Sequence, residues 1–220
     1  MSRPINRVRR QALLDTVVHY LGEHGVGVSS LRGIARDLHL HPNNLVHHFS
    51  TRTDLLRAAL QRAVELQRTP VEAAAHRHPG LTQGDLIRAW WKWTISDSAR
   101  LALARIGVEA ASLPPSVLNL RPDMPRFAWQ EGFFERLLET GLPRIDALTE
   151  SSRITAVVTG LVVDVANGSS KKRCTDVLDV ALRDLDGRVA SATGMVPMAA
   201  THAARVDRAK KPGTMLNAVS

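Results

Sequence analysis

Apolar residues recur along most of the chain at the three-to-four-residue spacing of an amphipathic α-helix. Runs in which apolar and polar residues alternate, as in a half-buried strand, are nearly absent. We therefore predict an all-α protein. The segments with helical spacing are 8–23, 31–38, 42–49, 53–68, 85–113, 126–140, 145–167 and 172–189, of which 85–113 is long enough for one or two helices.

Turn-forming residues divide these segments. The sequence TPVEAAAHRHPG over 69–80 predicts a helix end and a loop closed by Pro79-Gly80. Residues 190–220 are rich in small side chains and have no apolar periodicity, so we expect disorder there. The predicted organisation is an N-terminal domain over 1–52, a larger helical domain over 53–189 and a disordered tail over 190–220.

Positive charge is concentrated at the two ends of the chain. Residues 1–68 hold 10 Lys/Arg against 5 Asp/Glu, 69–188 hold 15 of each, and 189–220 hold 4 against 1. Scattered solvated charges are the simplest alternative. However, this distribution is typical of an N-terminal part that binds a polyanion, joined to a larger part without net charge.

Other features narrow the class of protein. The chain has no apolar run long enough to span a bilayer, and MSRPINRVRR does not have the pattern of a secretory signal. The single Cys174 excludes an internal disulfide, and its neighbours Asp176 and Asp179 are acidic, which disfavours a reactive thiolate. Because phosphate loops and nucleophile motifs are also missing, we expect a cytoplasmic protein that is not an enzyme.

The segment SSLRGIARDLHLHPNNLVHHF, residues 29–49, has the pattern of a helix-turn-helix. Ala35 supplies the small residue that lets two helices touch. Ile34 and Leu38 are expected to face inward on the first helix, and Leu45 and Phe49 on the second. Ser29 or Ser30 can cap the first helix and leave amides free for a backbone phosphate, and Thr51 or Thr53 can cap the helix that follows the motif.

The outward surface of the second helix is uncommon for a merely solvated helix, because it carries amides and a histidine instead of Glu and Lys. Asn can form a bidentate pair with adenine in the major groove, although Asn43 and Asn44 could instead only cap the helix. Arginines nearby can hold phosphates. The residues expected to contact DNA are Ser30, Arg32, Arg36, Pro42, Asn43, Asn44, His47 and Arg52.

Residues 10–60 resemble the N-terminal domain of the TetR family of repressors. The resemblance is carried by S-x-L-R-x-I-A-x-x-L at 29–38, by L-V-H-H-F at 45–49 and by S-T-R-T-D-L-L at 50–56. Two positions depart from the family pattern. His39 stands where the family has a glycine in the left-handed conformation, and Val46 stands where a tyrosine hydroxyl holds a phosphate.

The resemblance also implies a helical C-terminal domain that encloses a ligand and dimerises through its last two long helices, which here are similar to ITAVVTGLVVDVANG and CTDVLDVALRDLDG. The first is apolar over more than one face, so it needs a second neighbour, either a partner subunit or its own core. The residues expected at the dimer interface are Val158, Leu161, Val162, Val165, Leu178 and Leu182. Those expected to line a ligand pocket, with core packing as the alternative, are Trp90, Trp93, Arg105, Glu109, Trp129 and Phe133.

The histidines between 39 and 48 raise the question of a metal site, but no Cys or acidic residue accompanies them at ligand spacing, so we expect no metal and no cofactor. In the resemblance His48 falls on a position packed in the domain core. The sequence thus predicts a homodimeric, ligand-responsive transcriptional regulator, most simply a repressor that a small molecule releases from a palindromic DNA operator. The alternative is a helix-turn-helix protein controlled by a protein partner or by its own level.

Overall fold

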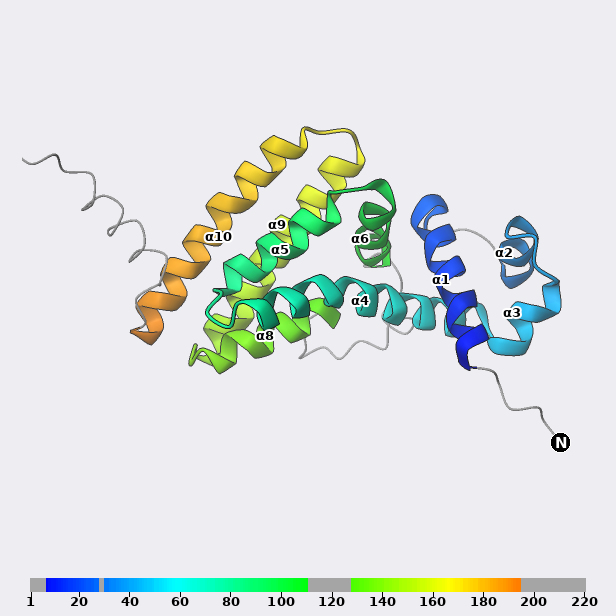
Figure 1. Cartoon of the computed structure of the whole chain (residues 1–220), viewed down its shortest axis with the longest axis horizontal. Helices are drawn as coiled ribbons and strands as arrows, with labels where there is room; N and C mark the ends of the chain where they lie inside the picture. Colours follow the sequence, from blue (N-terminus) through cyan, green and yellow to red (C-terminus); the bar gives the residue numbers. More distant parts are fainter. Residues whose placement is uncertain (1–6, 28–29, 111–127, 195–220) are drawn as a thin grey trace, which may run out of the picture.

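The computed structural model describes residues 7–27, 30–110 and 128–194, and within these ranges the secondary structure is entirely helical (Figure 1). No helix in this part of the chain is long and apolar enough to cross a membrane. The helices are α1 (Arg7–His24), α2 (Leu31–Asp37), α3 (Pro42–His48), α4 (Arg52–Arg77), α5 (Gln83–Thr94), α6 (Ser98–Ala110), α8 (Ala128–Glu139), α9 (Arg144–Ala166) and α10 (Lys171–Thr193).

The first three helices and the beginning of α4 pack together at one end of the molecule, and we call this part the head (Figure 1). Its core is apolar and is made mainly by Val17, Leu21, Ile34, Leu45 and Leu55. Two side chains of α6, Leu103 and Ile106, complete this core. The head therefore shares part of its hydrophobic core with the rest of the chain.

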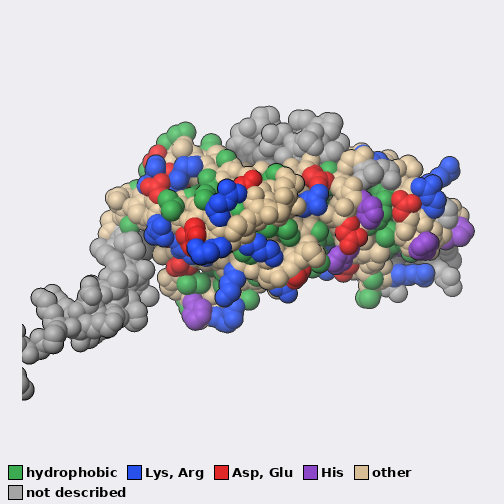
Figure 2. All heavy atoms as spheres, turned by 90° about the horizontal axis from the view of Figure 1, so that it is seen from above, with side chains coloured by type: hydrophobic (Ala, Val, Ile, Leu, Met, Phe, Trp, Pro, Cys, Tyr) green, Lys and Arg blue, Asp and Glu red, His purple; other side chains and the backbone are tan. Residues whose placement is uncertain are grey.

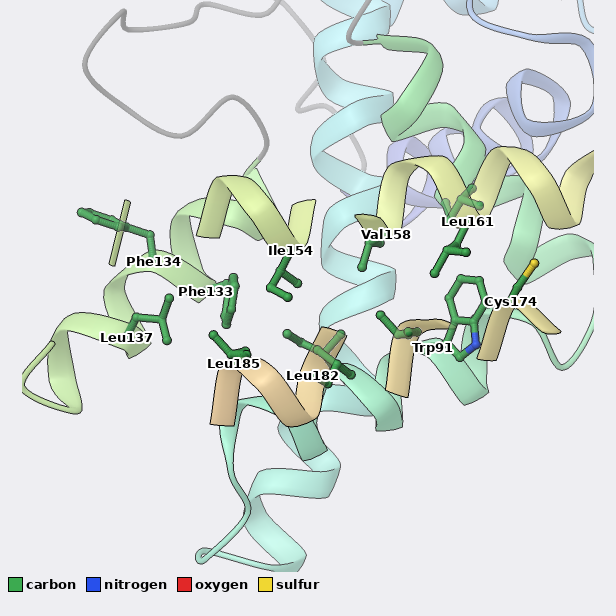
Figure 3. Packing of buried hydrophobic residues seen from close by; sticks show 14 of the residues in the cluster. Trp91, Phe133, Phe134, Leu137, Ile154, Val158, Leu161, Cys174, Leu182 and Leu185 are labelled. Atoms are coloured by element: carbon green, nitrogen blue, oxygen red, sulfur yellow. The ribbon is translucent and has the colours of Figure 1, made fainter. Parts of the chain in front are cut away.

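The remaining helices make up the larger part of the structure, which we call the body. Its core lies between α5, α6, α8, α9 and α10, and Figure 3 shows the packing around Trp91, Phe133, Ile154 and Leu182. The indole N–H of Trp91 donates to the hydroxyl of Thr175 on α10 at 2.9 Å, so the largest core side chain has its polar atom satisfied.

The helix α4 connects head and body and is longer than predicted. The pattern predicted a helix over 53–68, then a helix end and a loop over 69–80, but α4 continues without a break to Arg77 with Pro70 inside it. An ion pair between Arg68 and Glu72 spans the proline at 2.7 Å, and the alanines at 73–75 favour helix. The predicted domain boundary after residue 52 falls at the first residue of α4, and it stays a prediction.

The predicted disordered tail is wrong at its beginning. Residues 190–193 are the last turn of α10, which ends at Gly194 in the left-handed conformation with φ 67°. The sequence analysis missed this turn because residues 190–193, which include Ala190 and Ala192, show no apolar periodicity. Alanine nevertheless favours helix. Residues 195–220 lie outside the described part of the chain, as do the helical positions predicted at 111–113 and 126–127.

Candidate nucleic-acid interface

The first helix of the motif, α2, begins at a serine cap. Ser30 has extended backbone, and its hydroxyl accepts a hydrogen bond from the amide of Gly33 at 3.2 Å. Ile34 and Ala35 are fully buried in the head core, and Leu38 packs against it partly buried. Of the two candidate caps Ser30 is the one used, and both predicted inward residues, Ile34 and Leu38, face the core.

The turn between α2 and α3 has a left-handed residue at His39, with φ 52°. His39 is the one non-glycine residue in the described ranges with a positive φ. The turn is closed by the amide of Leu40, which donates to the carbonyl of Ala35 at 2.8 Å. The structure thus has the left-handed turn that the resemblance implies, with histidine in the place of glycine.

The second helix of the motif, α3, is capped by a residue that the sequence analysis missed. His41 has extended backbone, and its Nδ1 accepts a hydrogen bond from the amide of Asn43 at 3.3 Å. The capping position is therefore occupied by His41, and the side chains of Asn43 and Asn44 are not the helix cap. Histidine is not among the usual N-cap residues, so no sequence signal pointed to it.

Burial then fixes which face of α3 is outward. Leu45 and Phe49 are buried in the head core, as predicted. Asn43, Val46 and His47 are exposed, and Asn44 is partly buried. The predicted base-reading side chains Asn43 and His47 therefore share one solvent-facing surface with Val46, whose side chain is 48% exposed. Only the backbone of Pro42 belongs to the described part.

Arginine side chains lie on the two helices that precede α3. Arg32 and Arg36 on α2 are exposed, and Arg36 Nε donates to Asp37 at 3.1 Å. Arg10, at the start of α1, places its guanidinium 5.0 Å above the ring of Phe49 at the end of α3. Figure 2 shows histidine side chains mostly toward the end of the molecule that the head forms, whereas arginine and lysine side chains are spread along the whole visible face. Arg10 was not among the predicted residues, because only the fold brings it to α3.

His48 is less exposed than the neighbouring His47. Its Nδ1 is buried and has no hydrogen-bond partner within the described residues. Burial lowers the pKa of His48, and the nearby positive groups His47, Arg10 and Arg9 lower it further. The described residues include no cluster of three His, Cys, Asp or Glu side chains suited to a metal ion.

Arg52, predicted to hold a phosphate, points to the head's own backbone. Its Nη2 donates to the carbonyl of Val26 at 2.7 Å.

Two of the predicted pocket residues also lie near Val26. Glu109 accepts a hydrogen bond from the amide of Val26 at 3.0 Å, and Arg105 donates to the other oxygen of Glu109 at 3.0 Å.

The other predicted pocket residues lie elsewhere. Trp93 packs partly buried against the head core, whereas Trp90 packs against the body core and Phe133 is buried inside it. The side chain of Trp129 lies outside the described part. The structure therefore does not bring the predicted pocket residues together as one group.

The predicted dimer-interface residues lie inside the chain's own core, which corrects that prediction. Each is at most 7% exposed, and Figure 3 shows Val158, Leu161 and Leu182 in the packing of the body. Helix α10 and the other body helices cover the apolar arc of α9, so its own domain supplies the second neighbour that the pattern required. The residues concerned are Val158, Leu161, Val162, Val165, Leu178 and Leu182.

The described geometry is that of a helix-turn-helix head carried on a helical body. No protein-family model and no curated protein sequence matches the chain. Among solved structures, the chain is similar to the multidrug binding protein EbrR, solved in complex with imidazole. The two share 25% sequence identity and a TM-score of 0.53 over 79% of this chain and 94% of that one. Together with the helix-turn-helix, this likeness supports a TetR-like regulator.

Proposed function

We propose that this regulator binds a palindromic DNA operator as a homodimer and is released from it by a small molecule, so that it acts as a repressor. The observation that carries the proposal is the outward surface of α3, where Asn43 and His47 are exposed while Leu45 and Phe49 anchor the helix in the head core. Rigid placement of a short helix with amides on its free face suits insertion into the major groove.

In this proposal the residues around α3 have two roles. Asn43, Asn44 and His47 contact base edges, and Val46 lies beside them as an apolar group. Arg32 and Arg36 contact phosphates, and the free amides at the start of α2 that follow Ser30 add to this contact. Base contacts set the sequence preference, whereas phosphate contacts set the register and the salt dependence.

The proposed dimer interface is the outer face of α9 and α10, opposite the buried residues named above. Val163, Val177 and Val180 support it, because three large apolar side chains that are 40%, 49% and 59% exposed are costly to leave in water on neighbouring helices. On the same helices Gly160 and Gly187 have open space beside their Cα atoms, which permits close approach of a second copy.

The proposed effector site lies in the body. Its support is Thr94 at the end of α5, whose hydroxyl is fully buried and has no hydrogen-bond partner within the described residues. A buried unpaired hydroxyl costs about 1–3 kcal/mol, which a polar ligand atom would recover. Trp90 lies one turn earlier on α5, and Phe133 belongs to the same body core, so both remain proposed pocket residues.

The function is tested by measuring DNA release and ligand binding together. A library of small molecules is screened for compounds that raise the melting temperature of the protein, and each compound is then added to the protein–operator complex. The proposal predicts compounds that do both. If the protein binds a defined operator but no compound both stabilises and releases it, control by a protein partner or by concentration is the better account.

A further inference from the structure

The backbone of Val26, which lies just after α1 in the head and is 2% exposed, forms hydrogen bonds with α4 and α6, the two helices that continue into the body. Its amide donates to Glu109 Oε2 at 3.0 Å, and its carbonyl accepts from Arg52 Nη2 at 2.7 Å. Glu109 lies in the last turn of α6, and Arg52 is the first residue of α4. The two helices that run from the body to the head therefore hold the same residue of the head.

The carboxylate of Glu109 is itself held in position. Its second oxygen, Oε1, accepts from Arg105 Nη2 at 3.0 Å, one turn earlier on α6. Glu109 Oε2 lies close to the backbone at Gly25, where an added Cβ would be 2.9 Å from this oxygen. Gly25 also has a φ of 88°. Glycine at this position thus allows both the left-handed turn and the approach of the carboxylate.

Apolar contacts make the same joint rigid. Leu103 and Ile106 of α6 lie in the head core, and a Cβ on Gly22 of α1 would come within 2.8 Å of Ala102. The backbones of α1 and α6 therefore approach closely at Gly22 and Ala102, and the hydrogen bond between Val26 and Glu109 joins the residues after α1 to the last turn of α6. Charge-assisted hydrogen bonds are directional, so they fix the angle between head and body. Apolar contact alone would let the two surfaces slide over each other.

We propose that Glu109 and Arg52 are positioning residues that set the angle of the head on the body. The inference rests on the proposed function, because the angle matters when the two heads of a dimer must place both α3 helices in successive major grooves. In this role Arg52 acts through the Val26 carbonyl and makes no DNA contact of its own. Simultaneous engagement of two half-sites multiplies affinity only while the geometry permits it.

The test compares two DNA fragments for each variant: the palindrome recovered by selection from random DNA, and one half-site of it. Glu109→Ala removes the acceptor for Val26, and Arg52→Met removes the donor but keeps the apolar stem. Both variants should bind the palindrome about 10- to 100-fold more weakly and the half-site within about twofold of wild type. Glu109→Gln keeps an acceptor oxygen and should retain most of the affinity for the palindrome.

Arg36→Met is the matched control, since Arg36 is an exposed arginine proposed to contact phosphate. It should weaken both fragments alike and lower the slope of log affinity against log salt by about 0.9, the value for one phosphate contact. Arg52→Met should leave that slope unchanged. Both residues act through Val26, so their effects are expected to be coupled. The double variant Glu109→Ala, Arg52→Met should therefore lose no more affinity than the sum of the two single losses. It should lose less than the sum if one hydrogen bond depends on the other.

Each of the following results would overturn the inference. They are an equal loss on both fragments for Glu109→Ala, an unchanged affinity of that variant for the palindrome, and a reduced salt slope for Arg52→Met. A Glu109→Gln variant as weak as Glu109→Ala would also contradict it, provided that circular dichroism shows both to be folded. A wild-type protein that selects no DNA sequence would instead overturn the proposed function, and this inference with it.

Discussion

The hydroxyl of Tyr20 donates a hydrogen bond to the carboxylate of Asp37, with 2.8 Å between Oη and Oδ2. This bond ties α1 to the end of α2, and Asp37 also accepts from Arg36 Nε. Both donors favour the ionised carboxylate. The pKa of Asp37 therefore lies below its usual value, with the Tyr20 hydroxyl as the largest cause and Arg36 as the next.

Replacing Tyr20 by phenylalanine should raise the pKa of Asp37 toward its usual value, because the main donor is removed. Since the folded-state pKa is depressed, the stabilisation from Asp37 is present above the unfolded pKa of about 3.9 and is lost as the pH falls through the folded-state value. An NMR titration of the Asp37 carboxyl in wild type and Tyr20→Phe measures this. His19→Gln, an exposed change on α1, is the control, and an unmoved Asp37 titration in Tyr20→Phe would contradict the assignment.

The left-handed turn at His39 predicts an unusual response to glycine. His39→Gly should stabilise the protein by about 0.5–1 kcal/mol, because relief of the Cβ strain exceeds the added freedom of the unfolded chain. The same change at His19, an exposed position inside α1, should destabilise it by about 1 kcal/mol. Urea unfolding of both variants checks the prediction, and a destabilised His39→Gly protein would count against strain at this turn.

The partly buried His48 should make the head less stable in acid. Burial and the positive groups around it lower the pKa of His48, so its contribution is present above the unfolded pKa of about 6.5 and is lost as the pH falls below it. The free energy of unfolding should therefore fall between pH 7.5 and 5.5, and less so in His48→Phe. His76→Gln, at the exposed end of α4, is the control and should show the same pH dependence as wild type. A His48→Phe variant that also shows the wild-type pH dependence would contradict the prediction.

The outer valines of the last two helices should control assembly. Val163→Asp and Val180→Asp put charges on the proposed interface and should give monomers in analytical ultracentrifugation with little change in monomer fold. Leu182→Ala makes a cavity in the body core and should lower stability by about 2–5 kcal/mol instead. A dimer that survives both aspartates would place the interface elsewhere.

Local patterns predicted part of the head. Capping and periodicity rules offered Ser30 as one of two candidate caps, Thr51 as one of two, and Ile34 and Leu45 as buried, and the structure agrees at these positions. The left-handed turn at His39 came from the family resemblance instead, since composition alone gives no reason for it. His41 was missed as a cap because its residue type is not typical of that position.

The body shows where periodicity stops being informative. An apolar helix such as α9 needs neighbours, but the pattern does not say whether they belong to the same chain, and Val158 packs in the chain's own core. Contacts distant in sequence are likewise not visible in it. Glu109 bonds to Val26, 83 residues away, so a residue that suggested a ligand contact belongs to the joint between head and body.

The most direct test of the central claim is selection of bound sequences from random DNA with purified wild type and Asn43→Ala. The account predicts a palindrome whose half-sites lie one helical turn or a multiple of it apart. It also predicts that Asn43→Ala loses about 1–3 kcal/mol of preference at one base pair per half-site while its affinity for random DNA stays unchanged. No enriched sequence, or an equal loss on selected and random DNA, would contradict the account.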